Sequence, residues 1–226
     1  MDPMSQLALA TLVFAATHFF SSTPLRMTLV EAIGEKAYLG AYSLVSFLTL
    51  GWMVWAYLRA PALPVFQVPG VKLWPLVVMP FAMILLAAGL MSRNPSAVGQ
   101  AGRLKDAEPA RGILRVTRHP VMWAIALWAL VHLIARGDAA SIIFFGALAF
   151  VALAGTKLID RRKDETLGED WKRFAAVTSN VPFTAIVEGR NRLVLAEIGG
   201  KRVAAGLIAF AVFLLAHPYL FRARPW

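Results

Sequence analysis

Four histidines are the side chains with the most chemistry to offer in this sequence of 226 residues. They are His18, His119, His132 and His217, and each lies within or at the end of a long apolar stretch. An ionisable group inside an apolar span usually serves a function, because burying it in lipid is costly. Imidazoles on facing helices hold haem iron in many helical bundles. The histidines therefore indicate a haem site, although a neutral imidazole can also simply hydrogen-bond to a neighbouring helix.

Three arginines precede the second of these histidines. Arg111, Arg115 and Arg118 lead into His119-Pro120, and proline is favoured at the first position of a helix. The amino end of a helix attracts negative charge. The segment thus predicts an anion-binding, cofactor-binding pocket at a membrane surface with an imidazole in it. The alternative for any one arginine is that it only sets the orientation of the neighbouring helix.

Composition indicates that these residues belong to an integral membrane protein. Hydrophobic residues make up 58% of the chain and charged residues 16%, with a mean hydropathy of +0.62, whereas soluble domains carry about a quarter charged residues. Six stretches approach the roughly 20 apolar residues that a spanning helix needs, namely 4–21, 37–58, 73–91, 120–135, 141–159 and 203–216. We expect an all-α fold, a polytopic membrane helix bundle with about six transmembrane helices in a single domain over residues 1–226.

One further helix is expected in the long loop after the fifth stretch. Its apolar face repeats at helical spacing, and Glu169 and Arg173, one turn apart, are expected to form an ion pair. The residues of that face are Leu167, Trp171, Phe174 and Thr178. This pattern predicts a helix that lies on the cytoplasmic membrane interface.

The formal charge of +10 is distributed unevenly between the two sides of the predicted bundle. Eighteen lysines and arginines fall in loops on one side, and five fall on the other, namely Arg59, Lys72, Arg136, Arg222 and Arg224. Basic loops face the cytoplasm, so both termini are expected on the non-cytoplasmic side of the inner (cytoplasmic) membrane. Because this placement explains the positive charge, we expect the lipid bilayer as a partner and do not expect nucleic acid.

Several reaction classes are excluded by what the sequence lacks. It contains no cysteine, which rules out disulfides, thiolate metal sites and cysteine nucleophiles. It also contains neither a glycine-rich phosphate loop nor an H-E-x-x-H zinc motif. The amino terminus lacks the basic region of a signal peptide, so the first apolar run is expected to be retained.

Depth in the predicted membrane restricts which histidines could share one iron. In an up-and-down bundle, His18 lies near the cytoplasmic ends with His119, and His132 lies near the opposite ends with His217. The 13 residues from His119 to His132 correspond to roughly 20 Å along a helix. By this argument the candidate pairs are His18 with His119, or His132 with His217.

Several segments resemble the NnrU family, which includes the 15-cis-zeta-carotene isomerases of plants and algae. They are H-F-F-S-S-T-P-L-R (18–26), G-I-L-R-V-T-R-H-P (112–120), W-A-L-V-H (128–132), I-D-R-R (159–162), V-P-F-T-A-I-V-E-G-R (181–190) and A-H-P (216–218). The resemblance covers nearly the whole chain. It implies a polytopic protein with haem b that isomerises a central cis double bond of a carotene in a redox-dependent way, with His18 and His132 as ligands. That pair conflicts with the depth argument.

The resemblance also leaves alternatives open. Bacterial members are associated with nitrite and nitric oxide metabolism in denitrification, which would imply an accessory or redox-sensing role with an unknown redox partner. More distantly, R-H-P followed by G-E-D-W-K-R-F is similar to the isoprenylcysteine carboxyl methyltransferases, which use S-adenosylmethionine. Plant isomerases carry a cysteine where this chain has Ala129, so a thiol-based switch is not available here.

Overall fold

The computed structural model describes residues 1–23, 25–221 and 223, and these residues form helices joined by loops without any named strand. The elements are α1 (Pro3–Phe20), α2 (Leu25–Ile33), α3 (Glu35–Arg59), η1 (Val71–Leu73), α4 (Trp74–Leu90), η2 (Ala101–Lys105), α5 (Ile113–Val116), α6 (Pro120–Arg136), α7 (Ala139–Leu167), α8 (Glu169–Ala176), α9 (Thr184–Val187), α10 (Leu195–Ile198) and α11 (Gly200–Phe221). The all-α prediction is confirmed.

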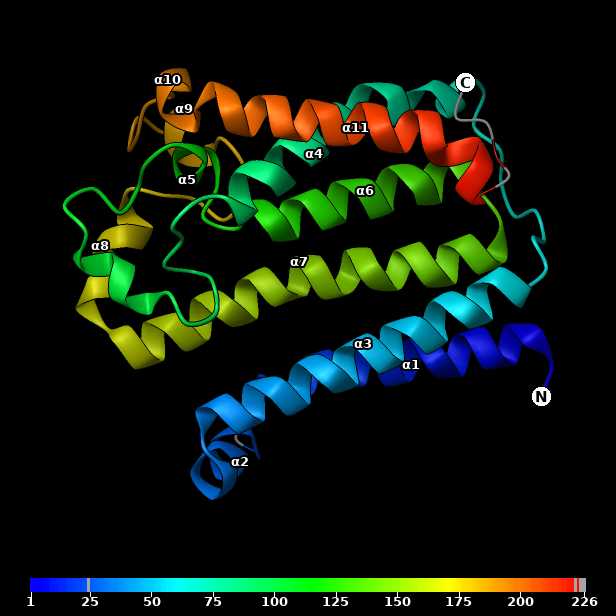
Figure 1. Cartoon of the computed structure of the whole chain (residues 1–226), viewed down its shortest axis with the longest axis horizontal. Helices are drawn as coiled ribbons and strands as arrows, with labels where there is room; N and C mark the ends of the chain where they lie inside the picture. Colours follow the sequence, from blue (N-terminus) through cyan, green and yellow to red (C-terminus); the bar gives the residue numbers. More distant parts are fainter. Residues whose placement is uncertain (24, 222, 224–226) are drawn as a thin grey trace.

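The six long helices lie side by side and run roughly along one axis (Figure 1). Helix α7 packs against α6 and α1, α6 packs against α4, and α4 packs against α11, while α3 packs mainly on α1. The order across the array is therefore α11, α4, α6, α7, α1 and α3. Helix α1 begins and α11 ends at the same end of the array, and we call the other end, where α7 runs into α8, the α8 end (Figure 1).

Each predicted span corresponds to one of these six helices. Helices α1, α3, α7 and α11 are long and apolar enough to cross a membrane, whereas α4 and α6 are apolar helices of 17 residues. The chain is thus a helical membrane protein. The fifth span differs most from its prediction, because α7 continues as a helix to Leu167, well beyond the predicted end at residue 159.

A tight connection joins α6 to α7 at the end opposite α8. Asp138 caps α7 by accepting a hydrogen bond from the Ser141 backbone N–H at 2.9 Å, and the Tyr57 hydroxyl lies 2.9 Å from Ser141 Oγ. Gly137 precedes this cap with φ +62°, and a Cβ there would lie 2.1 Å from the Phe66 carbonyl oxygen. Only glycine fits this position, because both the backbone conformation and the close approach exclude a side chain.

The predicted interfacial helix exists as α8, but its apolar face does not point towards lipid. Trp171 and Phe174 are each 2% exposed and pack in a hydrophobic cluster with Leu114 and Leu85 of the bundle. The predicted ion pair between Glu169 and Arg173 is wrong. Glu169 pairs with Lys172 instead, whose Nζ lies 2.9 Å from Glu169 Oε1, and Arg173 pairs with Asp170. Each of the two acids in this short helix thus pairs with the basic residue three positions later.

The sequence did not predict α2, a short helix between α1 and α3. None of its residues is buried, and Leu25, Met27 and Ile33 are each more than half exposed. This exposed apolar surface is suited to contact with lipid at the membrane boundary. Arg222 and Arg224, counted above among the charges of the less basic side, lie outside the described residues.

Close approach of α11 to α4 depends on Gly206. A Cβ added there would lie 2.7 Å from Ile84 Cα and 2.8 Å from the Met83 carbonyl oxygen, which are backbone atoms that cannot rotate away. We expect Gly206→Ala to push the helices apart and to cost about 1–3 kcal/mol, as overpacking usually does. Thermal unfolding in detergent, followed by circular dichroism, measures the loss.

Gly51→Ala is the matched control, because Gly51 lies in α3 and a Cβ there would meet nothing within 4 Å. It should leave the unfolding temperature unchanged or raise it slightly, since alanine favours helix. Equal unfolding temperatures for the two variants would contradict a tight contact between α4 and α11.

Candidate functional site

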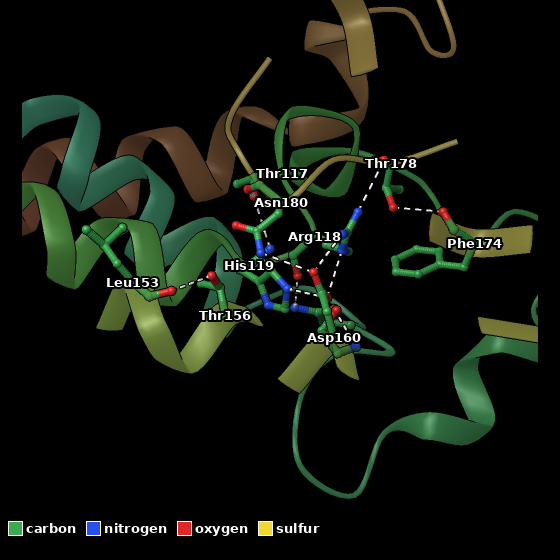
Figure 2. A network of polar contacts seen from close by, with 11 residues as sticks. Thr117, Arg118, His119, Leu153, Thr156, Asp160, Phe174, Thr178 and Asn180 are labelled. Carbon is green, nitrogen blue, oxygen red and sulfur yellow. Dashed lines mark hydrogen bonds and ion pairs between the residues drawn. The ribbon is translucent and has the colours of Figure 1, made fainter. Parts of the chain in front are cut away.

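A carboxylate near the α8 end of α7 receives hydrogen bonds from three other side chains (Figure 2). Arg118 binds Asp160 with two parallel bonds, from Nε to Oδ1 at 2.9 Å and from Nη2 to Oδ2 at 2.6 Å. His119 Nε2 lies 2.7 Å from Oδ1, and Asn180 Nδ2 donates to Oδ2 at 3.1 Å. The planar guanidinium fits the carboxylate in the strong bidentate geometry. Asp160 is thus fully occupied by partners of this chain.

The same cluster holds the loop after α8 against the start of α6. The Arg118 backbone N–H donates to the Ser179 carbonyl at 3.0 Å, and its Nη1 donates to the Thr178 carbonyl at 3.3 Å. Thr117 Oγ1 donates to the Asn180 carbonyl and accepts from the His119 backbone N–H. His119 itself is 3% exposed. These contacts make the cluster a structural junction, in which the Nε2 of His119 is engaged by Asp160.

Arg115 forms a separate ion pair on the other side of α5. Its Nε and Nη2 donate to the two carboxylate oxygens of Glu197 at 2.8 and 3.0 Å, and its Nη1 donates to Asn191 Oδ1 at 2.7 Å. The hydrogen bonds from Arg115 and from the Gly112 backbone N–H lower the pKa of Glu197 to about 2. Arg115 therefore fastens α5 to α10 and has little capacity left for a ligand.

Arg111 is the most accessible of the three predicted arginines. Its side chain is 63% exposed, and its Nε lies 3.6 Å from Glu108 Oε2. It lines a cavity of about 920 Å³ near the α8 end that also contains Arg93, Arg103 and Arg202. Acidic residues share this lining, and it contains no histidine. The structure thus separates the three arginines, and they do not surround His119 as the sequence predicted.

The other three histidines share one hydrogen-bonding arrangement. Nδ1 lies 2.8 Å from the Phe14 carbonyl in His18, 2.7 Å from the Trp128 carbonyl in His132, and 2.9 Å from the Ala223 carbonyl in His217. A carbonyl can only accept, so Nδ1 carries the proton in each neutral ring. The lone pair then resides on Nε2, which is the form in which histidine binds a metal.

Contacts along α7 give the relative depths of the end of α1 and of His119 and His132. The His132 ring lies 5.4 Å from that of Phe145, Phe19 beside His18 lies 5.5 Å from Phe150, and His119 bonds to Asp160. On α7, the contact of Phe19 is thus five residues from that of His132, about 7.5 Å, and ten residues from that of His119, about 15 Å. The ring of His18 itself meets Phe14 of α1 and Tyr42 of α3. Helix α1 thus ends beside the middle of the long α7, and which pair of histidines shares one iron stays a prediction.

The rings of His18 and His132 have similar apolar surroundings. His18 lies against Phe14 and His132 against Phe145, and both phenylalanines belong to one hydrophobic cluster that also contains the buried Ala129. His132 also interacts electrostatically with His217, at the end of α11. The structure therefore places His132 near His217, the second pair of the depth argument, and leaves His119 bonded to Asp160. In the described part of the chain, no three or more His, Cys, Asp or Glu residues form a metal-binding group.

Sequence reasoning missed two acidic residues of this region, Asp160 and Glu197. Asp160 comes directly after the predicted fifth span, inside the I-D-R-R segment, and that position was its only signal. Neither residue has a spacing that points to its arginine, which lies 42 or 82 positions away in the chain. Such pairs form only when the helices pack.

Comparison with known proteins identifies one family and two curated relatives. The family described as NnrU protein matches residues 6–225. The 15-cis-zeta-carotene isomerase of Arabidopsis thaliana is 38% identical over 84 residues, and that of Zea mays is 35% identical over 82 residues; both are chloroplastic. Each match covers 36% of this chain and 22% of the relative, so the chain matches about a fifth of their length. No solved structure matches.

Removing the carboxylate at the junction should destabilise the fold. Asp160→Asn leaves the largely buried Arg118 without its counter-charge, and we expect a loss on the order of 3 kcal/mol in unfolding free energy. Denaturant unfolding in detergent micelles measures it. Glu165→Gln is the control, because its ion pair with Arg161 on the same helix is exposed, and it should leave the unfolding free energy nearly unchanged. Similar losses in both variants would refute the junction.

Proposed function

The chain belongs to the NnrU family, and from this premise we propose that it is a membrane-embedded isomerase that acts on a cis double bond of a long apolar polyene such as a carotene. The observation that carries the proposal is the identity of 38% and 35% with two 15-cis-zeta-carotene isomerases. A carotene is a hydrocarbon that dissolves in the bilayer, so a membrane helix bundle is a suitable place to meet it. The proposal therefore agrees with the fold as well as with the relatives.

We further propose that His18 and His132 hold haem b through Nε2. Their Nδ1 atoms are already bonded to backbone carbonyls, which orients each ring and leaves Nε2 as the ligand atom. Both rings border one hydrophobic cluster, His18 through Phe14 and His132 through Phe145. The residues thus fit a low-polarity site with two imidazoles, the usual environment of haem b.

Each part of the chain then has a defined task in this function. When bound, haem b supplies an iron centre whose redox chemistry side chains lack. The two imidazoles would hold it, and Phe14, Phe145 and Ala129 belong to the apolar core around them. Exposed apolar residues of α3 such as Phe47 and Leu48 face the surroundings and allow a substrate to arrive from the bilayer. Because residue 129 is alanine, no thiol is present at this position to take part in the reaction.

We propose that the protein crosses the inner membrane with both termini on the non-cytoplasmic side. The basic loops lie at the α8 end, away from the beginning of α1 and the end of α11 (Figure 1). Positive loops remain in the cytoplasm during insertion. Because the chain has no cysteine, single substitutions report topology without background. Cysteine at Ser5 should react with an impermeant maleimide in intact cells, and cysteine at Ser92 should not; the reverse pattern would invert the orientation.

Isomerase activity is tested in a carotenoid-producing host that lacks its own 15-cis-zeta-carotene isomerase. We expect expression of the chain to convert the accumulated 15-cis form to the isomer in which this double bond is trans. Chromatography of the extracted pigments measures the conversion. Purified protein from the same cells should show a Soret band. A Soret band without conversion would replace the isomerase by the accessory role in denitrification. Conversion and Soret band both missing would favour the methyltransferase alternative, in which Arg118, His119 and the loop after α7 would bind S-adenosylmethionine.

The assignment of the ligands is tested by histidine variants and their absorption spectra. We expect His18→Ala and His132→Ala each to abolish the Soret band, since each variant would lack one of the two residues proposed to hold the haem. His119→Ala serves as a control for folding defects, because this ring is bonded to Asp160. It should lower stability and leave the spectrum of the folded fraction unchanged. Loss of the spectrum in His217→Ala but not in His18→Ala would move the site to His132 and His217.

A further inference from the structure

A group of positive side chains lies where α2 and the beginning of α3 meet the α8 end of α7. Arg26 lies over the ring of Tyr38, with its guanidinium carbon 5.4 Å from the ring centroid. Arg162 is close enough to Arg26, Tyr38 and Tyr42 for electrostatic interaction, and Lys163 is close enough to Arg162 and Arg26. We call Arg26, Arg162, Lys163 and Tyr38 the α2–α7 cluster.

These charges are withdrawn from water and lack sufficient compensation. The Arg26 side chain is 18% exposed, and Lys163 is 9% exposed. Among the described residues, the one carboxylate within ion-pair distance is that of Glu35, 3.7 Å from Arg26 and itself 67% exposed. Three cations thus face one solvated acid. Like charges in a partly buried place repel each other more strongly than in water, so the cluster costs stability unless an anion joins it.

An orphaned hydroxyl points independently to a missing ligand. Tyr38 is 5% exposed, and its hydroxyl is buried without a hydrogen-bond partner among the described residues. A buried polar atom without a partner costs about 1–3 kcal/mol. Such an atom is normally explained by an unseen water, ion or ligand. Since this hydroxyl lies among cations, an oxyanion is the group that satisfies both features.

The surroundings decide which oxyanion fits. Helix α2 has no buried residue, and its Leu25, Met27 and Ile33 are more than half exposed next to the cluster. Above them along α3, Leu44 and Leu48 are also exposed. A phosphate in the cluster therefore lies at the edge of a surface suited to acyl chains. Basic pockets between membrane helices commonly bind anionic lipid headgroups.

We propose that the α2–α7 cluster binds the phosphate of an anionic phospholipid. Arg26, Arg162 and Lys163 neutralise the headgroup, the Tyr38 hydroxyl donates a hydrogen bond to a phosphate oxygen, and the acyl chains lie along α2 and α3. The bound lipid thereby joins the α1–α3 hairpin to the end of α7. This site is distinct from the proposed isomerase site and does not depend on it.

Native mass spectrometry of the detergent-purified full chain with phosphatidylglycerol, and with phosphatidylcholine as the neutral probe, measures this binding. We expect phosphatidylglycerol to be retained preferentially. Arg162→Gln should weaken its retention about tenfold, and Tyr38→Phe, which removes only the hydroxyl, about fivefold. Arg161→Gln is the matched control, because this adjacent arginine is exposed and paired with Glu165, and it should leave retention unchanged.

Thermal unfolding gives a second readout that a merely structural arginine would not produce. In neutral detergent, Arg162→Gln should unfold at a higher temperature than the wild type, because it relieves repulsion. Added phosphatidylglycerol should stabilise the wild type more than the variant. The proposal is overturned if both lipids bind equally, or if Arg161→Gln and Arg162→Gln lose the same retention. It is also overturned if millimolar inorganic phosphate stabilises the wild type as much as phosphatidylglycerol does, since the site would then accept a free anion.

Discussion

The carboxylate of Asp160 joins parts of the chain that are far apart in sequence. It pairs with Arg118 and His119 at the start of α6 and with Asn180 in the loop after α8. Through it, the long α7 is fixed to α6 at the end where both meet water. Because the bonds are charge-assisted and only partly exposed, they define the register of these two helices more firmly than apolar contacts alone would. The relative depth of every other residue on α6 follows from that register.

This register bears directly on the histidines. With His119 fixed at the level of Asp160, the ring of His132 lies beside Phe145. Helix α1 is shorter than α7 and ends beside its middle, where Phe19 meets Phe150. Phe19, the neighbour of His18 in sequence, is thereby nearer in depth to the contact of His132 than to that of His119. The unequal lengths of α1 and α7 therefore place the end of α1 beside the middle of α7, and not at the level of Asp160.

The charged residues near the α8 end fall into two groups with different consequences. Arg115 and Arg118 are matched by Glu197 and Asp160 and hold the loops in place. The α2–α7 cluster has an excess of positive charge and an unbonded hydroxyl. In both groups the arginine is partly withdrawn from water, so what separates a structural arginine from a candidate binding residue is whether the protein provides the counter-charge.

The sequence by itself determined the helical class, the six apolar stretches and the uneven distribution of basic loops. These are properties of local composition and length, which the bilayer translates directly into spanning helices. It also identified the histidines worth testing. The tertiary structure decided which acid each arginine meets, how far α7 extends, that Trp171 and Phe174 of α8 pack inward, and that α2 exists. Those outcomes depend on contacts between residues many positions apart, and no periodicity along the chain encodes them. The level at which α1 ends beside α7 is of the same kind, because it follows from the stagger of whole helices.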